Sequence, residues 1–566
     1  MDSMNSFNGN GKVDEVEQQA FKKKTRKRLI ILAVSSIVLV AIIIAAVAGT
    51  AQQTSSSADK SAPASSLRAV CNVTQYPNSC FSSISSLPNT NTMDPTHLFN
   101  LSLRVATNAL SNLSPYLSNL QRNASDSRLQ KAIHVCEMLL QDAISRFNDS
   151  ISSLVGAQDL LPATKVNDIQ TWLSAAITDQ DTCLDALQEL NSSDANAILY
   201  DLKTDMKNST EFASNSLAIV TKILGLLSNF NATVHRRLLG GFPEWMDRRL
   251  LQESHVTADA VVAKDGSGQY STITEAVEAV EKRSEKRFVI YVKEGTYEEN
   301  IDLDADTWNV MIYGDGKSKT IISGSRNFVD GTPTFQTATF GVKGRGFIGK
   351  DIGFVNSAGA EKQQGVAMLS ASDRSVFYRC SFDGFQDTLY AHSNRQFYRE
   401  CDITGTIDFI FGNAAVVLQN CNIMPRQPLA NQFNTITAQG KTDPNQNTAI
   451  VIHKSSISAL HDLQSPTYLG RPWKDYSTTV IMHSDIASFV NPAGWTSCYP
   501  NEDPPNTILY AEYQNTGPGS DTSQRVKWPG YKPALTEEEA GTFTVQSFIQ
   551  GPEWLPDAAV QFEPTL

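Results

Sequence analysis

The chain has 566 residues, too long for one ordinary domain, and its 41% apolar and 19% charged residues exclude a wholly disordered protein. Its formal charge of −12, from 47 basic and 59 acidic residues, argues against a nucleic-acid-binding protein, because such proteins bind phosphates through lysine and arginine. The eight cysteines and eight histidines show neither CxxC nor HExxH spacing, so we expect no metal site and no cofactor.

The first 49 residues have the pattern of a secretory-pathway signal. Residues 1–28 are polar and end in a basic run, and residues 29–49 carry no charge over a length that can span a bilayer. The basic flank predicts a cytosolic tail at 1–28 and a transmembrane signal anchor at 29–49. A signal peptide cleaved near Ala48 is the alternative, and either way the rest of the chain enters the secretory lumen. Residues 50–66, rich in serine and alanine, are predicted to be a linker.

Eight Asn-x-Ser/Thr sequons support a lumenal location. All of them lie between residues 72 and 233, and none follows. Chance clustering in a stretch rich in serine and asparagine explains part of this pattern, but a lumenal first half explains it better. The predicted glycosylation sites are Asn72, Asn100, Asn112, Asn123, Asn148, Asn191, Asn208 and Asn231.

Residues 67–230 are predicted to form an all-α domain. Apolar residues recur at helical spacing in four stretches between residues 94 and 228, which fits an up-down four-helix bundle. Asp94 and Asp126 have the positions of helix N-caps. In an oxidising lumen, two local disulfides are the simple interpretation of the cysteines here. These cysteines are Cys71 with Cys80, and Cys136 with Cys183.

A linker at 231–252 separates the two halves of the chain. It contains two copies of Arg-Arg-Leu-Leu, at 236–239 and 248–251. Dibasic pairs are common by chance, but two identical tetrapeptides at a domain boundary favour cleavage by a processing protease. The predicted processing residues are Arg236, Arg237, Arg248 and Arg249.

Residues 253–566 are predicted to be mainly β. Short β-branched and aromatic runs at 377–382, 397–403 and 417–423 align with a period of 20 or 21 residues. A repeat of this length predicts a solenoid, and one strand per turn on several faces would make a parallel β-helix. Leucine-rich repeats share the period, but their Leu/Asn signature is absent.

The same period brings polar side chains together. Asp387 and Asp408 are 21 residues apart, and Gln364 and Gln386 are 22 apart. Because successive coils lie about 4.8 Å apart, these four residues should converge on three adjacent coils. Two close carboxylates cannot easily both ionise, so one can act as an acid, and the amides can donate to an oxyanion. A purely structural ladder of polar residues is the alternative.

At these residues the chain resembles the plant pectin methylesterases. Five motifs carry the likeness in order, at 295–299 (GTYEE), 364–368 (QGVAM), 386–389 (QDTL), 408–412 (DFIFG) and 469–473 (LGRPW). The second motif has Gly365 and Met368 where the family usually has alanine and leucine. The resemblance implies a right-handed parallel β-helix catalytic domain. The first half is similar to the family's inhibitor-like four-helix pro-region.

The resemblance also implies roles for individual residues. Asp408 would be the nucleophile, and Asp387 would be first the proton donor and then the base. Gln386 and Gln364 would stabilise the oxyanion, and Arg471 would keep Asp408 ionised and oriented. Further substrate contacts are expected at Thr334 and Trp473, and sugar stacking, with buried packing as the alternative, at Tyr390, Phe411 and Trp495.

A third disulfide is implied by the resemblance alone. The family pattern pairs Cys401 with Cys421. The spacing by itself would fit a bond between Cys380 and Cys401 equally well. Cys380 and Cys498 would then be free thiols.

The expected function is hydrolysis of the C6 methyl esters of homogalacturonan pectin to pectate and methanol, through an aspartyl acyl-enzyme, in the cell wall. The pro-region would inhibit or retain the enzyme in the Golgi until a protease removes it. Alternatively, the helical half is released as a separate inhibitor of pectin methylesterases, and an inhibitor of this type would also be a partner. A polygalacturonase or a pectate lyase on the same solenoid is the remaining alternative.

Overall fold

The computed structural model describes residues 62–88, 90, 92–156, 161–228, 257–499 and 502–566. The predicted cytosolic tail, the signal anchor, both Arg-Arg-Leu-Leu sites and Asn231 lie outside these residues. Within the described ranges, no helix combines the length and the apolar character needed to cross a bilayer.

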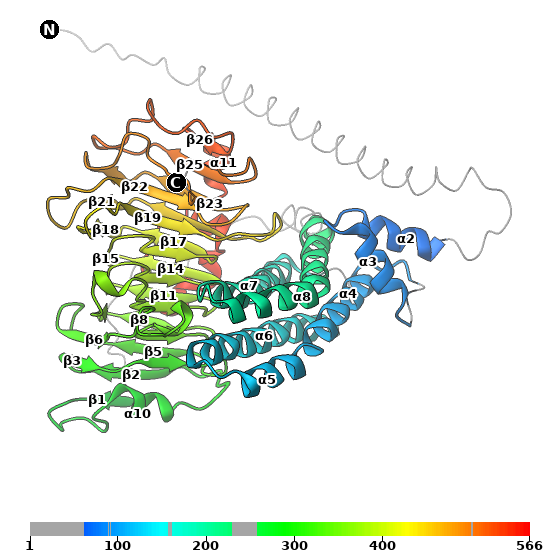
Figure 1. Cartoon of the computed structure of the whole chain (residues 1–566), viewed down its shortest axis with the longest axis horizontal. Helices are drawn as coiled ribbons and strands as arrows, with labels where there is room; N and C mark the ends of the chain where they lie inside the picture. Colours follow the sequence, from blue (N-terminus) through cyan, green and yellow to red (C-terminus); the bar gives the residue numbers. More distant parts are fainter. Residues whose placement is uncertain (1–61, 89, 91, 157–160, 229–256, 500–501) are drawn as a thin grey trace, which may run out of the picture.

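The first half is helical, and its four long helices α4, α6, α7 and α8 pack against one another as a bundle (Figure 1). The predicted four-helix bundle is therefore confirmed. The helical segments are α2 (Ala62–Cys71), α3 (Pro77–Ser85), α4 (Pro95–Ser111), α5 (Ser114–Asn123), α6 (Ser127–Ser153), α7 (Ala163–Gln188), α8 (Ser193–Ile219) and the π-helical turn Val220–Leu224. Because α2 begins at Ala62, the prediction of a linker over the whole of 50–66 was wrong at its C-terminal end.

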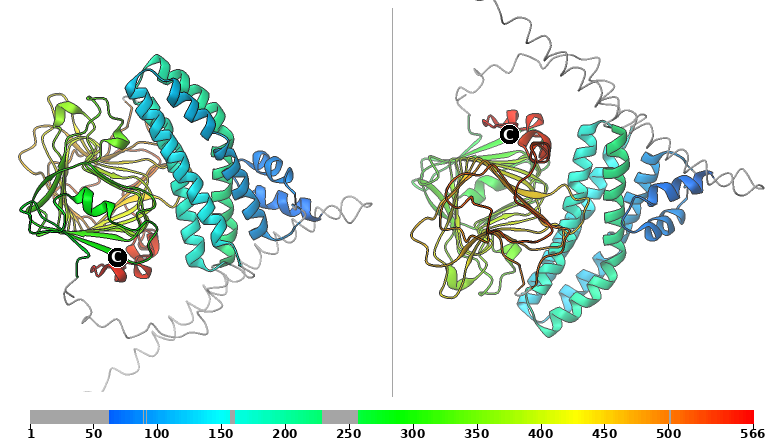
Figure 2. Two further views of the ribbon diagram at one scale, coloured as in Figure 1. Left: turned by 90° about the horizontal axis from the view of Figure 1, so that it is seen from below. Right: turned by 90° about the horizontal axis from the view of Figure 1, so that it is seen from above.

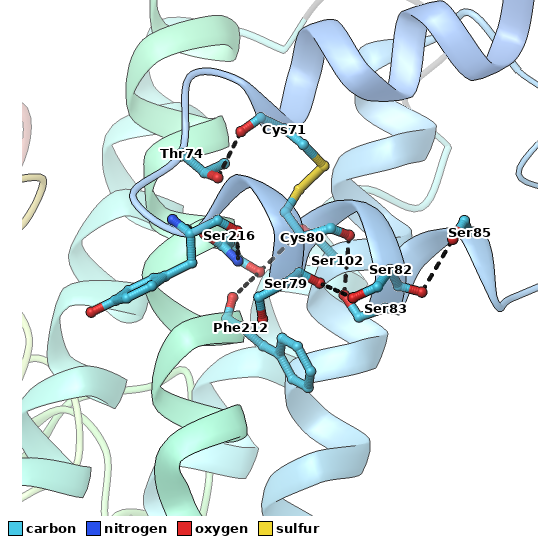
Figure 3. The surroundings of a disulfide bond; sticks show 12 residues. Cys71, Thr74, Ser79, Cys80, Ser82, Ser83, Ser85, Ser102, Phe212 and Ser216 are labelled. Carbon is cyan, nitrogen blue, oxygen red and sulfur yellow. Dashed lines mark hydrogen bonds between the residues drawn. A yellow bond between two sulfur atoms is a disulfide. The ribbon is translucent and has the colours of Figure 1, made fainter.

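The helix starts follow from capping. The side chains of Asp94 and Asp126 accept hydrogen bonds from the backbone N–H of the second residue of α4 and of α6, at 2.9 and 2.8 Å. Two disulfides hold the bundle, as predicted, one between Cys71 and Cys80 and one between Cys136 and Cys183. Figure 3 shows the first, which ties α2 to α3 beside α4 and α8. The seven sequon asparagines among the described residues are exposed except Asn100, which is half-buried.

The second half is a parallel β-helix with three sheets, as predicted (Figures 1 and 2). Sheet A consists of β1 (Ala260–Val262), β2 (Phe288–Val292), β5 (Val310–Tyr313), β8 (Ile348–Lys350), β11 (Ser375–Tyr378), β14 (Arg395–Arg399), β17 (Ala415–Gln419), β20 (Ala449–His453), β23 (Thr478–Met482), β25 (Leu509–Tyr513) and β26 (Tyr531–Lys532). Sheet B consists of β3 (Gly295–Glu298), β6 (Thr320–Gly324), β9 (Gly353–Asn356), β12 (Ser381–Asp383), β15 (Asp402–Gly405), β18 (Asn422–Pro425), β21 (Ser456–Ile457) and β24 (Asp485–Ile486). Sheet C consists of β4 (Ile301–Leu303), β7 (Phe340–Val342), β10 (Met368–Ser370), β13 (Leu389–Ala391), β16 (Ile410–Gly412), β19 (Asn434–Gln439) and β22 (Thr467–Pro472).

The three sheets enclose one apolar interior, and two of them are covered on the outside. Sheet A carries the C-terminal segment, which contains α11 (Glu537–Gly541), α12 (Val545–Phe548) and two 3-10 turns. Sheet C is covered by the helical bundle, which lies against one side of the solenoid (Figure 2). Leu369, Tyr390, Phe411 and Ala438 occupy one outward column of sheet C and join the apolar core of the bundle. The short helix α10 (Ile273–Glu278) contacts β1 and β4 at the first coil.

The implied disulfide between Cys401 and Cys421 is not formed in the structure. Cys380, Cys401 and Cys421 stack in three successive coils, and all are buried free thiols. Backbone carbonyls satisfy these thiols, since Cys401 Sγ lies 3.4 Å from the oxygens of Phe377 and Arg399.

The prediction that Trp495 stacks on sugar was also wrong. Its side chain is only 1% exposed and packs in the solenoid interior against Tyr510, with Nε1 donating to Glu512. Irregular chain surrounds Trp495, so no strand alternation showed which way the indole points.

Candidate active site

The polar residues predicted to converge do lie on adjacent coils. Asp387 and Asp408 each stand two residues before a sheet C strand, β13 or β16, and the pairing of Leu389 with Ile410 places them opposite each other. Both adopt left-handed backbone conformations, with φ of 62° and 51°. An isolated parallel bridge joins Gln364 to Gln386 on the neighbouring coil. All four line one cavity of about 320 Å³.

Asp408 is held in one orientation by an ion pair and a hydroxyl donor. Arg471 donates through Nε to Oδ1 at 2.8 Å and through Nη2 to Oδ2 at 2.5 Å, a bidentate pair. Thr435 Oγ1 donates to Oδ1 at 2.6 Å. These donors leave Asp408 no freedom to turn away from the cavity.

Asp387 has the opposite character. It is 8% exposed, and among the residues that the structure describes no hydrogen bond to its side chain stabilises the charged form. Burial raises the pKa of Asp387 well above its usual range, and the negative charges of Asp408 and Glu189 raise it further, whereas Arg471 opposes them. Burial therefore favours the protonated form of Asp387.

Two side-chain amides stand beside the carboxyl groups. Gln364 and Gln386 line the cavity, and Gln364 Oε1 is buried without a hydrogen-bond partner. Gly365, which departs from the family motif, leaves room for a neighbouring side chain, because an added Cβ would lie 2.9 Å from Asn356 Oδ1. Asn356 in turn donates to the carbonyl of Val366, so the glycine is accommodated without loosening the backbone.

An aromatic wall flanks these polar groups. Tyr390 and Phe411 stack with ring centroids 4.1 Å apart, and the ring centroid of Trp473 lies 6.3 Å from that of Phe411. Thr334 lines the same cavity. Of the three aromatic residues predicted to stack on sugar, the structure brings Tyr390 and Phe411 to the site and places Trp495 elsewhere.

The bundle supplies the remaining walls of the cavity, which sequence reasoning missed. The Glu189 carboxylate accepts from the backbone N–H and the hydroxyl of Thr334, at 3.2 and 2.5 Å. Asp185 forms an ion pair with Lys474 at 2.6 Å. Nothing in the local sequence of Glu189 signals these contacts, because they join residues 145 and 289 positions apart.

Polar contacts continue along the whole of α7. Each joins a polar residue of α7 to a turn that follows a sheet C strand. The pairs are Thr171 with Asn447, Ser174 with Gln446, Thr178 with Asn413, Asp181 with Thr442, and Thr182 with His392. Among the described residues, no three histidine, cysteine, aspartate or glutamate side chains come together in a way that could hold a metal ion.

Thr435 is a second residue that the sequence did not reveal. It lies 27 residues after Asp408 rather than 20 or 21, because residues 426–433 extend that coil. We expect Thr435→Val to lower kcat roughly tenfold, since Asp408 loses one neutral donor. Thr435→Ser should restore the rate, because serine keeps the hydroxyl. Equal rates in the valine and serine variants would exclude a positioning role, and a kcat assay on an esterified substrate distinguishes the two results.

Known proteins show the same two-part organisation. Residues 259–552 match the family described as Pectinesterase, and residues 65–219 match the family described as Plant invertase/pectin methylesterase inhibitor. Pectinesterase 3 of Phaseolus vulgaris is 66% identical over 100% of both chains, and Pectinesterase 1 of Arabidopsis thaliana is 56% identical over 99% of both. The solved pectin methylesterase from carrot is 51% identical, with a TM-score of 0.54, and the match covers 56% of this chain and 100% of the carrot chain.

Proposed function

The chain belongs to the pectinesterase family, with an inhibitor-like helical region before its catalytic solenoid, and on this premise we propose that it demethylates pectin through an aspartyl acyl-enzyme. The observation that supports the mechanism is the asymmetry of the two carboxyl groups. Asp408 is paired with Arg471, whereas Asp387 is buried and its raised pKa favours the protonated form.

In the first step, an Asp408 oxygen attacks the C6 carbonyl carbon of a methylated galacturonate. The carbonyl π electrons move to oxygen, and the amide groups of Gln386 and Gln364 donate to this oxyanion. As the intermediate collapses, the bond to the methoxy oxygen breaks and Asp387 gives that oxygen its proton, so methanol leaves. The product is an anhydride between Asp408 and the sugar carboxyl group.

In the second step, Asp387 is now a carboxylate and takes a proton from water. The water oxygen attacks the sugar carbonyl of the anhydride, and the bond to Asp408 breaks. Asp408 returns as a carboxylate, Asp387 is again an acid, and the sugar is released as a carboxylic acid that loses its remaining proton to solvent and becomes a carboxylate. The aromatic wall of Tyr390, Phe411 and Trp473 offers faces for the sugar rings.

Methanol release tests this function directly. Residues 253–566, incubated with methyl-esterified homogalacturonan, should release methanol while the length of the polymer stays constant. Scission of the chain without methanol release would instead indicate a polygalacturonase or a lyase, and would overturn the proposal.

The helical region is proposed to keep this site closed. Glu189 and Asp185 occupy the catalytic cavity and engage Thr334 and Lys474, so a sugar chain cannot reach Asp408 while α7 is in place. The same surface would act on another enzyme if the bundle were released. Isolated residues 67–230 should then inhibit separated residues 253–566, and an unchanged rate at micromolar bundle would reject the inhibitor role.

The closed state is predicted to weaken as the pH rises. Burial raises the pKa of Asp181 and of Glu189 to about 7. Lys474 and Thr442 lower the pKa of Asp181, and Thr334 lowers that of Glu189, but burial outweighs them. Once separated and exposed, such carboxyl groups titrate near 4, so association takes up protons. The contribution of these two carboxyl groups to binding between the halves is therefore fully present below about pH 4 and is lost as the pH rises through about 7.

A titration of the cleaved pair measures this effect. The Kd should rise at least about tenfold per pH unit between pH 5 and 7. Glu189→Gln, which imitates the protonated form, should flatten the slope, whereas Glu211→Gln, away from the cavity, should not. A Kd independent of pH would contradict the prediction.

We also propose that the chain travels through the secretory pathway and acts in the cell wall after cleavage between residues 231 and 252. The exposed sequons and the two disulfides of the bundle support an oxidising, lumenal route. N-terminal sequencing of the wall-located protein would test this. A mature N-terminus before residue 67 would show that the bundle is retained.

A further inference from the structure

A row of arginines lies at one corner of the solenoid, outside the catalytic cavity. Arg345 and Arg374 stand in the turns from sheet C to sheet A of two successive coils, and Arg395 begins β14, the sheet A strand of the next coil. A backbone hydrogen bond from Gly346 to Asp373 joins the turns of Arg345 and Arg374, and one from Asn309 to Arg345 joins the first of them to the preceding coil. Adjacent arginines are thus carried by strands about 4.8 Å apart.

An indole and a cavity accompany this row. The guanidinium of Arg345 lies 3.9 Å from the ring centroid of Trp308, and that of Arg283 lies 5.9 Å from it. A cavity of about 390 Å³ separates this corner from α6 and α7, with Trp308, Arg345 and Arg374 among its lining residues. Arg374 Nε is buried without a hydrogen-bond partner.

The bundle faces the arginines with carboxylates. Asp168 accepts from Arg374 at 2.9 Å and from Arg395 at 2.7 Å. Asp142 and Asp149 line the same cavity from α6, and the charge of Arg345 acts on Asp149. The helical region therefore places acidic groups along the arginine row.

The solenoid's own carboxylates only partly neutralise the row. Asp373 holds Arg395, but Arg374 has its ion pair only with Asp168 among the described residues. Arg345 pairs with Glu285, whose side chain is 77% exposed, and exposed pairs exchange partners at little cost. Once the bundle leaves, Arg374 and Arg345 are therefore open to another anion.

We propose that this corner is a second carbohydrate site, which binds demethylated galacturonan after the bundle departs. The inference rests on the proposed function, because it takes the product of that reaction as the ligand. Sugar carboxylates replace Asp168 and its acidic neighbours on Arg374 and Arg345, and the face of a sugar ring stacks on Trp308. A half-chain that carries the whole −12 charge would otherwise repel a polyanion, so local cations are needed to retain it.

Residues 253–566 are suitable for the test. Their strands enclose an apolar interior to which the bundle contributes no residue, and the carrot enzyme is a solved chain covered completely by this region. The probe is fully demethylated polygalacturonate at low salt, with Kd measured for wild type and for Arg345→Ala/Arg374→Ala. The matched control is Lys317→Ala/Arg379→Ala, which removes two paired cations from the turns between sheets A and B.

We expect the Arg345/Arg374 double variant to bind roughly tenfold to hundredfold more weakly, with the control unchanged. The intact chain should also bind weakly, because its acidic residues occupy the site. Equal affinity in both double variants would overturn the inference, with thermal melting confirming that each is folded. A wild-type protein that binds through these arginines but releases no methanol would reject the proposed function and leave this site standing.

Discussion

Replacing Asp408 with asparagine is expected to lower kcat for methanol release at least about 10⁴-fold. The amide cannot act as the attacking carboxylate, and none of the groups around it can substitute. Arg471 is already paired with Asp408, and burial raises the pKa of Asp387, which favours its protonated form. Asparagine keeps the size of the side chain and one oxygen for Arg471, so the loss reports chemistry rather than packing. Methanol release by residues 253–566 is the measurement.

Asp402→Asn is the matched control. Asp402 lies in β15 on the same coil, pairs with Lys317 at 2.7 Å on the surface, and should retain full activity. Thermal melting of both variants separates loss of function from loss of fold. An Asp408→Asn enzyme within tenfold of wild type would refute the acyl-enzyme mechanism, whatever the control shows.

Cutting the chain between the bundle and the solenoid is expected to raise esterase activity at least about 100-fold. While the linker is intact, the bundle is tethered beside the cavity, and its effective concentration reaches the millimolar range. Cleavage removes this advantage, so dilution lets α7 leave Thr334 and Lys474. The experiment places a site for a sequence-specific protease at 240–246 and follows methanol release before and after digestion.

A scrambled site at the same position is the control, and it should stay inactive with the protease. Glu189→Ala in the uncut chain should raise its activity, because the carboxylate that occupies the cavity is removed. If the uncut chain were already as active as the digested one, the bundle would not be an inhibitor of its own solenoid.

The spacing of the coils predicted that Asp387 and Asp408 meet, because residues one coil apart in the sequence of a parallel β-helix are neighbours in space. Asp387 and Asp408, 21 residues apart, lie opposite each other, each two residues before one of two neighbouring strands. The bundle was predictable for a similar reason, since caps such as Asp94 act within two residues. The helix caps are a local signal in the sequence, and the coil spacing is a periodic one.

The parts that were missed depend on breaks in periodicity or on contacts between domains. Thr435 is displaced by an extended coil, and Trp495 lies in irregular chain where inward and outward positions do not alternate. The contact of Glu189 with Thr334 joins residues of different domains. For Cys401, stacking with thiols on both sides leaves the partner open, and the structure shows no bond.

The path of α7 across sheet C has a consequence for how the solenoid unfolds. In a stack of coils each repeat contacts only its neighbours, so unfolding can spread from an end. The contacts of α7 extend from Thr334, near β7, to Lys474, after β22, and these strands are separated by four others in sheet C. The helix therefore joins coils that do not otherwise touch. The uncut chain should melt as one cooperative unit, whereas the solenoid separated from the bundle should lose this cross-link and open coil by coil.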